Sequence, residues 1–179
     1  MRADFAVVSR RRLLKYGLSA AAFLGMGGVG SLLALRGRAP DVAGLRCLTA
    51  HEYRTLERLA DALFPAGGAF ALGADHLDLA RQLDGFLADE PPWNVLDLKR
   101  ALALLEFGPV LFDRRLATFS HLPADERLAH FERWTTSSSD TLRGAALAFR
   151  RFLTTRFYDR PAAWPSVGYE GPLVNVKDA

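Results

Sequence analysis

The sequence predicts an all-α protein, with an N-terminal signal or anchor helix, a compact bundle of about five helices and an extended C-terminal tail rich in proline, glycine and aromatic residues. Apolar residues recur at helical spacing between breaks marked by proline and glycine. Strand-like alternation is nearly absent, and the chain contains no isoleucine. The predicted segments are a signal or anchor at 1–38, a linker at 39–47, a helical domain at 48–160 and a tail at 161–179.

The N-terminal segment reads as an export signal. An uncharged run of twenty residues, Tyr16 to Leu35, follows a basic stretch. Adjacent arginines before a moderately apolar run are typical of a twin-arginine signal, which carries folded proteins to the periplasm. A chain with this signal is either a cofactor protein or the escort of one. The predicted signal residues are Ser9, Arg10, Arg11, Leu13, Leu14 and Lys15.

The sequence leaves open whether this leader is cleaved off or retained. Its uncharged run matches the ~20 residues that a helix needs to cross a bilayer. The nearest match to a cleavage site is Gly37-Arg38-Ala39, with Pro40 behind it. The leader is therefore either removed or retained as an anchor in the inner membrane. Lipid attachment at Cys47 is disfavoured, because Arg46 stands where a small residue is needed.

The charge distribution argues against nucleic-acid binding. Residues 1–38 hold seven basic and one acidic side chain, a net of 7 − 1 = +6, so the remaining residues carry 3 − 6 = −3. The body is mildly acidic with interspersed signs, which gives no basic groove or stripe.

Gly25, Gly27 and Gly30 match the spacing of a dinucleotide-binding fingerprint. Such a fingerprint requires a preceding strand and a surrounding βαβ unit, which are missing here. The glycines are better explained as residues that lower the hydrophobicity of the leader.

The first two helices have recognisable ends. Thr49 and Glu52 form a capping box, with Leu48 as the outer half of a hydrophobic staple. The helix ends at Phe64 because Pro65 follows. One face contains Tyr53, Leu56, Leu59, Ala60 and Leu63. A second helix is predicted from Asp75, as its cap, to near Pro91, and buries Leu79, Leu83, Phe86 and Leu87.

The next two helices follow proline-containing breaks. The third begins after Pro91-Pro92 and buries Leu98, Ala101, Leu102 and Leu105, with Trp93 as a further candidate. Residues 110–119 either continue it past Gly108-Pro109 or form a short helix of their own. The fourth helix covers 125–135, with Leu128, Phe131 and Trp134 inward.

The fifth and strongest helix runs from its cap, Ser139, to Tyr158. Its apolar residues recur on one face. They are Leu142, Ala145, Ala146, Phe149, Phe152 and Leu153.

The sequence shows no arrangement that predicts chemistry on this chain. The four histidines have no helical spacing to one another and form no Cys/His cluster, so metal binding has no local support. Without a C-x-x-C-H motif, covalent haem is not expected. Acidic pairs at helix starts are explained by the helix dipole. We expect no catalytic, cofactor-binding or metal-binding residue here.

The tail contains large aromatic residues that packing within a bundle does not explain. Proline and glycine are expected to keep this segment from forming a helix, while Trp164 and Tyr169 rarely lie free in water. The tail therefore either packs on its own helices or contacts a partner. The predicted contact residues are Tyr158, Trp164, Gly168, Tyr169, Gly171 and Pro172.

The chain resembles the small subunit (subunit 3, or gamma) of membrane-associated, FAD-dependent sugar dehydrogenases of the gluconate 2-dehydrogenase type. The resemblance is carried by three groups of residues that span most of the chain. They are Ser9-Arg10-Arg11; the first helix from Leu48-Thr49 through Glu52 and Leu56 to Phe64-Pro65; and Tyr158, Pro161, Trp164, Gly168-Tyr169 and Gly171-Pro172.

This resemblance implies a non-catalytic subunit in a periplasmic complex. Its partners would be a GMC-type catalytic subunit that holds FAD, a multihaem cytochrome c and the twin-arginine translocon, with no cofactor on this chain. Arg10 and Arg11 would engage the translocon, so the folded flavoprotein would travel with the small subunit. Two alternatives remain: a membrane-anchored helical scaffold unrelated to any dehydrogenase, and a stand-alone exported enzyme.

Overall fold

The structure is a computed structural model that describes residues 33–67 and 71–171. Every regular element in these ranges is a helix, which confirms the all-α prediction. Residues 50–158 contain five α-helices: α3 (Ala50–Leu63), α4 (Leu79–Leu87), α5 (Pro92–Phe112), α6 (Ala124–Thr135) and α7 (Asp140–Tyr158). Two 3₁₀ helices, η1 (Phe119–His121) and η2 (Pro161–Val167), complete the fold.

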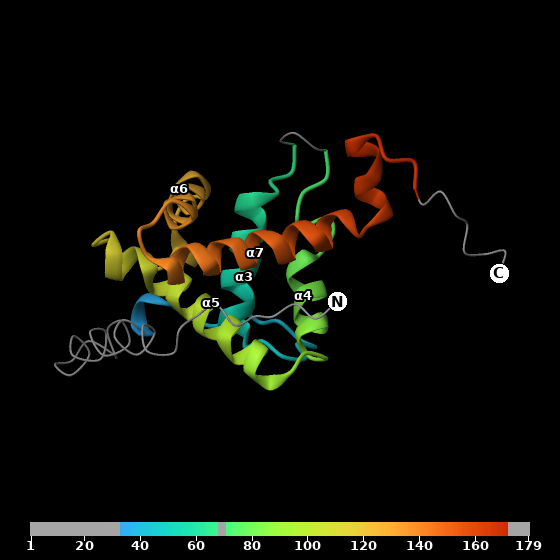
Figure 1. Cartoon of the computed structure of the whole chain (residues 1–179). Coiled ribbons are helices and arrows are strands. Elements are labelled where there is room, and N and C mark those ends of the chain that lie inside the picture. Colours follow the sequence, from blue (N-terminus) through green and yellow to red (C-terminus); the bar gives the residue numbers. More distant parts are fainter. Residues whose placement is uncertain (1–32, 68–70, 172–179) are drawn as a thin grey trace.

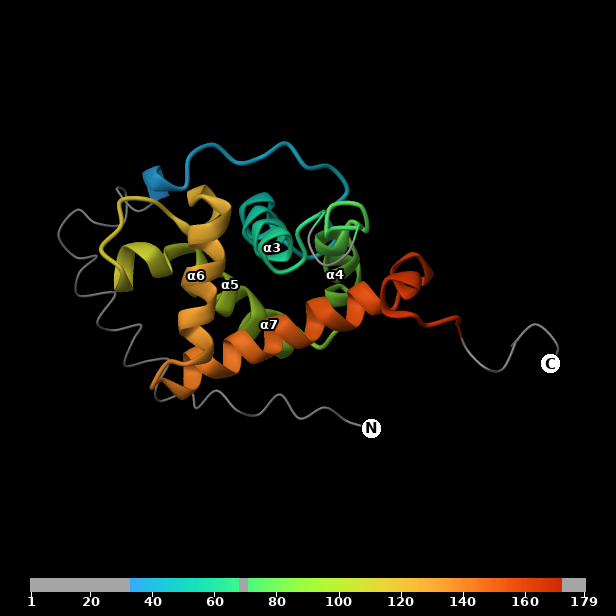
Figure 2. The same ribbon diagram turned by 90° about the horizontal axis from the view of Figure 1, so that it is seen from above.

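Helix α3 is the centre of the bundle. It packs against α4, α5, α6 and η1, while α7 lies across α4 and α6 (Figures 1 and 2). The fully buried core is built mainly from leucine and phenylalanine side chains of all five helices, including Leu56, Leu83, Leu105, Phe131 and Phe149. Burying apolar surface of this kind is the main driving force of folding. The predicted bundle of about five helices is confirmed.

The first helix begins and ends as its sequence predicts. Thr49 is the N-cap of α3, and its capping box with Glu52 is complete: the Glu52 N–H donates to Thr49 Oγ1, and the Thr49 N–H donates to Glu52 Oε2. The C-cap is Phe64, immediately before Pro65. Local signals were sufficient here because every group involved lies within a few residues.

The predicted start of the second helix is wrong. Asp75 is not its cap, because α4 begins only at Leu79, after a turn that places Asp78 in the left-handed region at φ 47°. The Asp75 carboxylate contacts the His76 ring instead, at 2.8 Å. An acidic side chain this far from a helix cannot satisfy its first N–H groups.

Helix α5 continues through Pro109 as one element to Phe112. Of residues 110–119, for which two alternatives were open, 110–112 continue the helix, and 113–118 form no helix before η1 begins at Phe119. Leu98, Leu102 and Leu105 are buried as predicted, while Ala101 is partly buried. Trp93, in contrast, is 67% exposed at the start of the helix.

Helices α6 and α7 follow the predicted ranges closely. Ser139 caps α7, and Phe131 and Trp134 of α6 are buried. Leu128 was predicted to point inward but is exposed. The buried face of α6 instead contains Arg127, His130, Phe131 and Trp134, so Leu128 lies about 100° further round the helix than Arg127.

The prediction that proline and glycine keep the tail from forming a helix is wrong for residues 161–167. These residues form η2, which packs on the end of α7. Pro161 stands in the first turn, where its missing N–H would have no helical partner. Figure 1 shows η2 projecting from the bundle at the end of α7, opposite the end where residues 33–36 lie.

Candidate functional site

The C-terminal tail is held against α7 by Trp164. The Trp164 indole N–H donates to the carbonyl of Tyr158 at 2.9 Å, and the backbone N–H of Tyr169 donates to the carbonyl of Trp164 at 3.1 Å. Ala163, one residue earlier, is fully buried. The tail thus packs on its own helix, which was one of the two open alternatives.

The backbone conformation at Gly168 and Gly171 explains why these two positions of the predicted contact set are glycine. Gly168 ends η2 with φ +68°, and Gly171 has φ +119°. A Cβ atom on Gly171 would lie 3.3 Å from the Trp164 ring. Glycine is the residue that adopts such backbone angles without strain. These glycines fold the chain back around Trp164.

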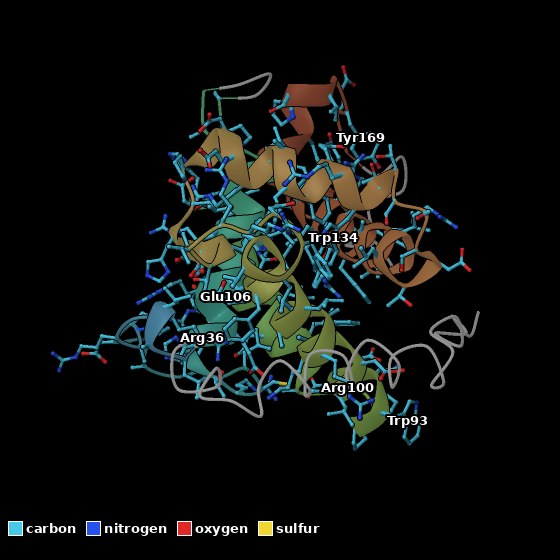
Figure 3. All side chains as sticks on the ribbon, turned by 90° about the vertical axis from the view of Figure 1, so that its left-hand side faces the viewer. Arg36, Trp93, Arg100, Glu106, Trp134 and Tyr169 are labelled. Carbon is cyan, nitrogen blue, oxygen red and sulfur yellow. The ribbon has the colours of Figure 1, made fainter. Side chains whose placement is uncertain are left out.

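This arrangement leaves an apolar surface, which we call the tail surface: Val167, Tyr169 and the outer part of Trp164. The Trp164 and Tyr169 rings meet edge-on, with centroids 5.2 Å apart, and Tyr169 remains 47% exposed. Figure 3 shows Tyr169 at the edge of the molecule opposite Trp93. Rigid aromatic groups held this way lose little entropy on binding a partner. Five of the six predicted contact residues therefore come together, and Pro172 lies outside the described residues.

The predicted export residues Ser9, Arg10, Arg11, Leu13, Leu14 and Lys15 also lie outside the described residues. What the structure describes is the segment behind them. Residues 36–48, which we call the strap, run across the surface of the body to α3 (Figure 2). This segment contains the predicted linker.

The end of the strap is bound by the carboxylate of Asp84 on α4. Asp84 accepts the backbone N–H groups of Arg46 at 2.7 Å, Cys47 at 3.0 Å and Leu48 at 2.7 Å. The side chain is almost fully buried. Burial acts to raise the pKa of Asp84, but the three N–H donors outweigh it and lower the pKa below its ordinary value.

Three basic side chains of the body bind carbonyl groups of the strap. Arg54 donates to the carbonyl of Arg38 at 2.7 Å, Lys99 donates to Cys47 at 2.7 Å, and Arg81 donates to Ala43 at 3.1 Å. The Arg36 guanidinium lies over the Phe107 ring, 5.3 Å from its centroid. The strap is therefore docked along its whole length by groups from α3, α4 and α5.

The Cys47 thiol is partly buried within the strap. Burial raises its pKa above the ordinary value, and Lys99 opposes that shift. A raised pKa lowers the thiolate fraction and with it the reactivity of the sulfur.

A second buried carboxylate, Glu106 of α5, joins three elements (Figure 3). It accepts from the Thr55 hydroxyl at 3.0 Å, the Ser120 N–H at 3.1 Å and the Ser120 hydroxyl at 2.8 Å. Its donors come from α3 and η1, 51 and 14 positions away. With both oxygens bound by donors of the protein, Glu106 acts as a structural tie between helices.

The sequence reasoning also missed a buried histidine–carboxylate pair. His130 Nδ1 lies 2.6 Å from Asp113 Oδ2, and Arg133 also contacts that carboxylate. Burial lowers the pKa of His130, and Asp113 opposes this shift. The other ring nitrogen faces the backbone of α5, since a Cβ on Gly108 would be 2.6 Å from it. The ring is enclosed by α5, Phe119 and Trp134.

An open cavity of about 520 Å³ lies between α3 and the turn before α4. Its acidic residues include Glu57 and Asp61, whose pKa values are raised by burial. The Tyr53 hydroxyl donates to Asp78 at 3.2 Å, and burial raises the pKa of Tyr53 to about 12. Arg58 pairs with Asp61 at 3.5 Å. Four of the polar residues that line the cavity are thus paired with one another.

Within residues 33–67 and 71–171, no group of three or more His, Cys, Asp or Glu side chains is arranged to hold a metal ion. In the same ranges, no helix combines the length and the apolar character that spanning a membrane would require. No family model, curated protein sequence or solved structure matches this chain.

Proposed function

We propose that this chain is the non-catalytic small subunit of a periplasmic sugar or alcohol dehydrogenase complex. It escorts the folded, FAD-containing GMC-type subunit through the twin-arginine translocon and then stabilises it. A multihaem cytochrome c would accept the electrons, and the substrate is oxidised on the partner. The proposal combines the resemblance of the sequence with the signal residues Ser9 to Lys15.

The tail surface is the observation that supports this role best. Tyr169 is exposed yet held in place by Trp164, which is itself fixed to the end of α7. Aromatic residues in fixed positions at the centre of an interface commonly supply most of its binding energy. On this proposal, the tail surface inserts into a pocket of the flavoprotein, and the next residues, Gly171 and Pro172, also contact the partner.

Co-purification of the flavoprotein tests the contact. The variant Tyr169→Ala with Val167→Ser removes the exposed part of the tail surface and keeps Trp164. We expect the flavin absorbance that co-purifies with the chain to fall at least tenfold. This corresponds to a loss of about 1.4 kcal/mol or more in binding free energy. Leu147→Ser, at a site 69% exposed on α7, is the matched control. Unchanged flavin recovery in the tail variant would overturn the contact.

Export is tested separately by the conservative double change Arg10→Lys and Arg11→Lys. Retention of the partner flavoprotein in the cytoplasm is expected, although the tail surface is intact. Full export of the partner would refute the escort role. A purified wild-type chain that carries its own stoichiometric chromophore would instead support a stand-alone enzyme.

A further inference from the structure

Three exposed apolar residues lie close together where α5 ends. Leu111 and Phe112 form its last turn, and Leu116, which is 87% exposed, follows four residues later. Arg114 adopts a left-handed backbone at φ 54°, and the Arg115 N–H bonds back to the Pro109 carbonyl at 3.0 Å. Three exposed apolar side chains within six residues form a patch, which is unusual for a surface that faces only water.

The leader joins the body at this same end. Arg36 lies over Phe107, which is one helical turn before Leu111. Gly37 is beside His121 of η1, since a Cβ there would lie 3.4 Å from the ring. Figures 1 and 2 both show residues 33–36 and the segment after α5 at the same end of the molecule. The uncharged run 16–35 therefore ends beside the patch.

Arg114 stands between Phe112 and Leu116 of the patch, and Arg38 follows Gly37 at the same end of the body. Among residues 33–67 and 71–171, Arg38 and Arg114 form no ion pair, whereas neighbouring Arg115 pairs with Glu126 at 3.0 Å. This end of the body thus offers positive charge around apolar side chains.

We propose that this end of the bundle, comprising Leu33, Leu111, Phe112 and Leu116 with Arg38 and Arg114, lies on the surface of an anionic phospholipid membrane. The inference rests on the proposed export leader staying attached, which brings the patch to the bilayer. Exposed apolar groups enter the boundary between headgroups and acyl chains, and arginines bind anionic headgroups. The tail surface, at the opposite end of α7, then faces away from the membrane and remains free for a partner.

Site-specific fluorescence on the full chain in phosphatidylglycerol-containing vesicles tests this proposal. In a Cys47→Ser background, an environment-sensitive dye is attached at Leu116→Cys or, as the control, at Val167→Cys on η2. The dye at position 116 is expected to shift to the blue and to be quenched by a lipid-borne quencher. The dye at position 167 is expected to keep the emission of a dye exposed to water and to escape the lipid-borne quencher. Equal responses at both positions, or no response at 116, would overturn the proposal.

Two further experiments distinguish lipid from other molecules that could cover the patch. Changing Arg38→Ser and Arg114→Gly should lower the ratio of membrane-bound to free dye at position 116 by about fivefold per arginine. A concentration-dependent shift without lipid would show that a second copy covers the patch, and would refute the membrane assignment. The assay contains no flavoprotein, so its failure is distinct from failure of the co-purification test.

Discussion

The carboxylate of Asp84 and the backbone N–H of Leu48 are joined by a 2.7 Å hydrogen bond across 36 positions of sequence. Arg46 and Cys47 donate to the same carboxylate. These bonds fix the point where the strap enters α3. The path by which the strap reaches α3 therefore depends on one buried side chain of α4.

Replacing Asp84 by Ala should loosen the strap. Three N–H groups, of which that of Leu48 is buried, lose their acceptor, and hydrogen bonds to charged groups contribute about 1.5–3 kcal/mol each before relaxation. We expect a loss of about 2–4 kcal/mol in the free energy of unfolding, measured by urea denaturation. Limited proteolysis should cut within residues 39–47 sooner than in the wild type. Asp89→Ala, which removes only an exposed pair with Arg46, is the control and should change little.

Two groups make the protein less stable in acid. The pKa values of His130 and Asp84 are both lower in the folded protein than their ordinary values of 6.5 and 3.8. The unfolded chain therefore binds more protons, so stability is present above these ordinary values and is lost as the pH falls. Thermal unfolding should show a first decline below pH 6.5 and a second below pH 3.8. In Asp84→Asn the second decline should be smaller; an equal decline would contradict the assignment.

Changing Glu106 to Gln should destabilise the bundle even though the side chain keeps its size. The amide is uncharged and keeps one acceptor oxygen in place of two, so the hydrogen bonds from Thr55 and Ser120 lose their charge-assisted strength. We expect a loss of about 1–3 kcal/mol in the free energy of unfolding, measured by denaturant titration. Glu132→Gln on the surface of α6 is the matched control. A loss at Glu106 no larger than at Glu132 would refute its role as a tie.

Gly108→Ala tests the close approach of His130 to α5. The added Cβ would lie 2.6 Å from the imidazole, so we expect a loss of about 1–3 kcal/mol from overpacking. A double-mutant cycle with His130→Ala should recover part of that loss, because the clash disappears. Gly144→Ala on α7 meets no atom within 4 Å and should stabilise by about 0.5–1 kcal/mol. Additive effects of Gly108→Ala and His130→Ala would contradict this geometry.

Trp164→Phe should release the tail from α7 without unfolding the bundle. The change removes the hydrogen bond to the Tyr158 carbonyl, whose net contribution is about 1 kcal/mol. Hydrogen exchange of the Tyr169 amide, which donates to the Trp164 carbonyl, should quicken. Amides in the middle of α7 should exchange as before. Faster exchange throughout α7 would mean that the tail supports the whole helix.

The sequence predicted helices best where their signals are local. The capping box of Thr49 and Glu52, the Ser139 cap and the apolar face of α7 all depend on residues a few positions apart. Asp75 failed as a cap because its carboxylate meets His76 instead. For α6, the buried face includes two polar residues, Arg127 and His130, which a pattern of apolar residues alone does not reveal.

The buried polar groups were beyond the reach of sequence reasoning. Asp84 and Glu106 look like ordinary helix-surface acids until their donors, 14 to 51 positions away, are brought beside them. His130 and Asp113 lie on different sides of η1 and meet only through the packing of α6 against the end of α5. In the tail, Trp164 and Tyr169 could be selected as unusual residues, but their ring contact follows from the turn at Gly168.

The docking of the strap also fixes an order of events during synthesis. Cys47 leaves the ribosome long before Lys99, whose ammonium binds its carbonyl from 52 positions downstream. The strap can therefore reach its final path only after α4 and part of α5 have been made. Since chains are extended by roughly 5–20 residues per second, residues 36–48 stay undocked for several seconds after their synthesis. Once α5 is in place, the strap has all its docking partners, while α6 and α7 are still to be made.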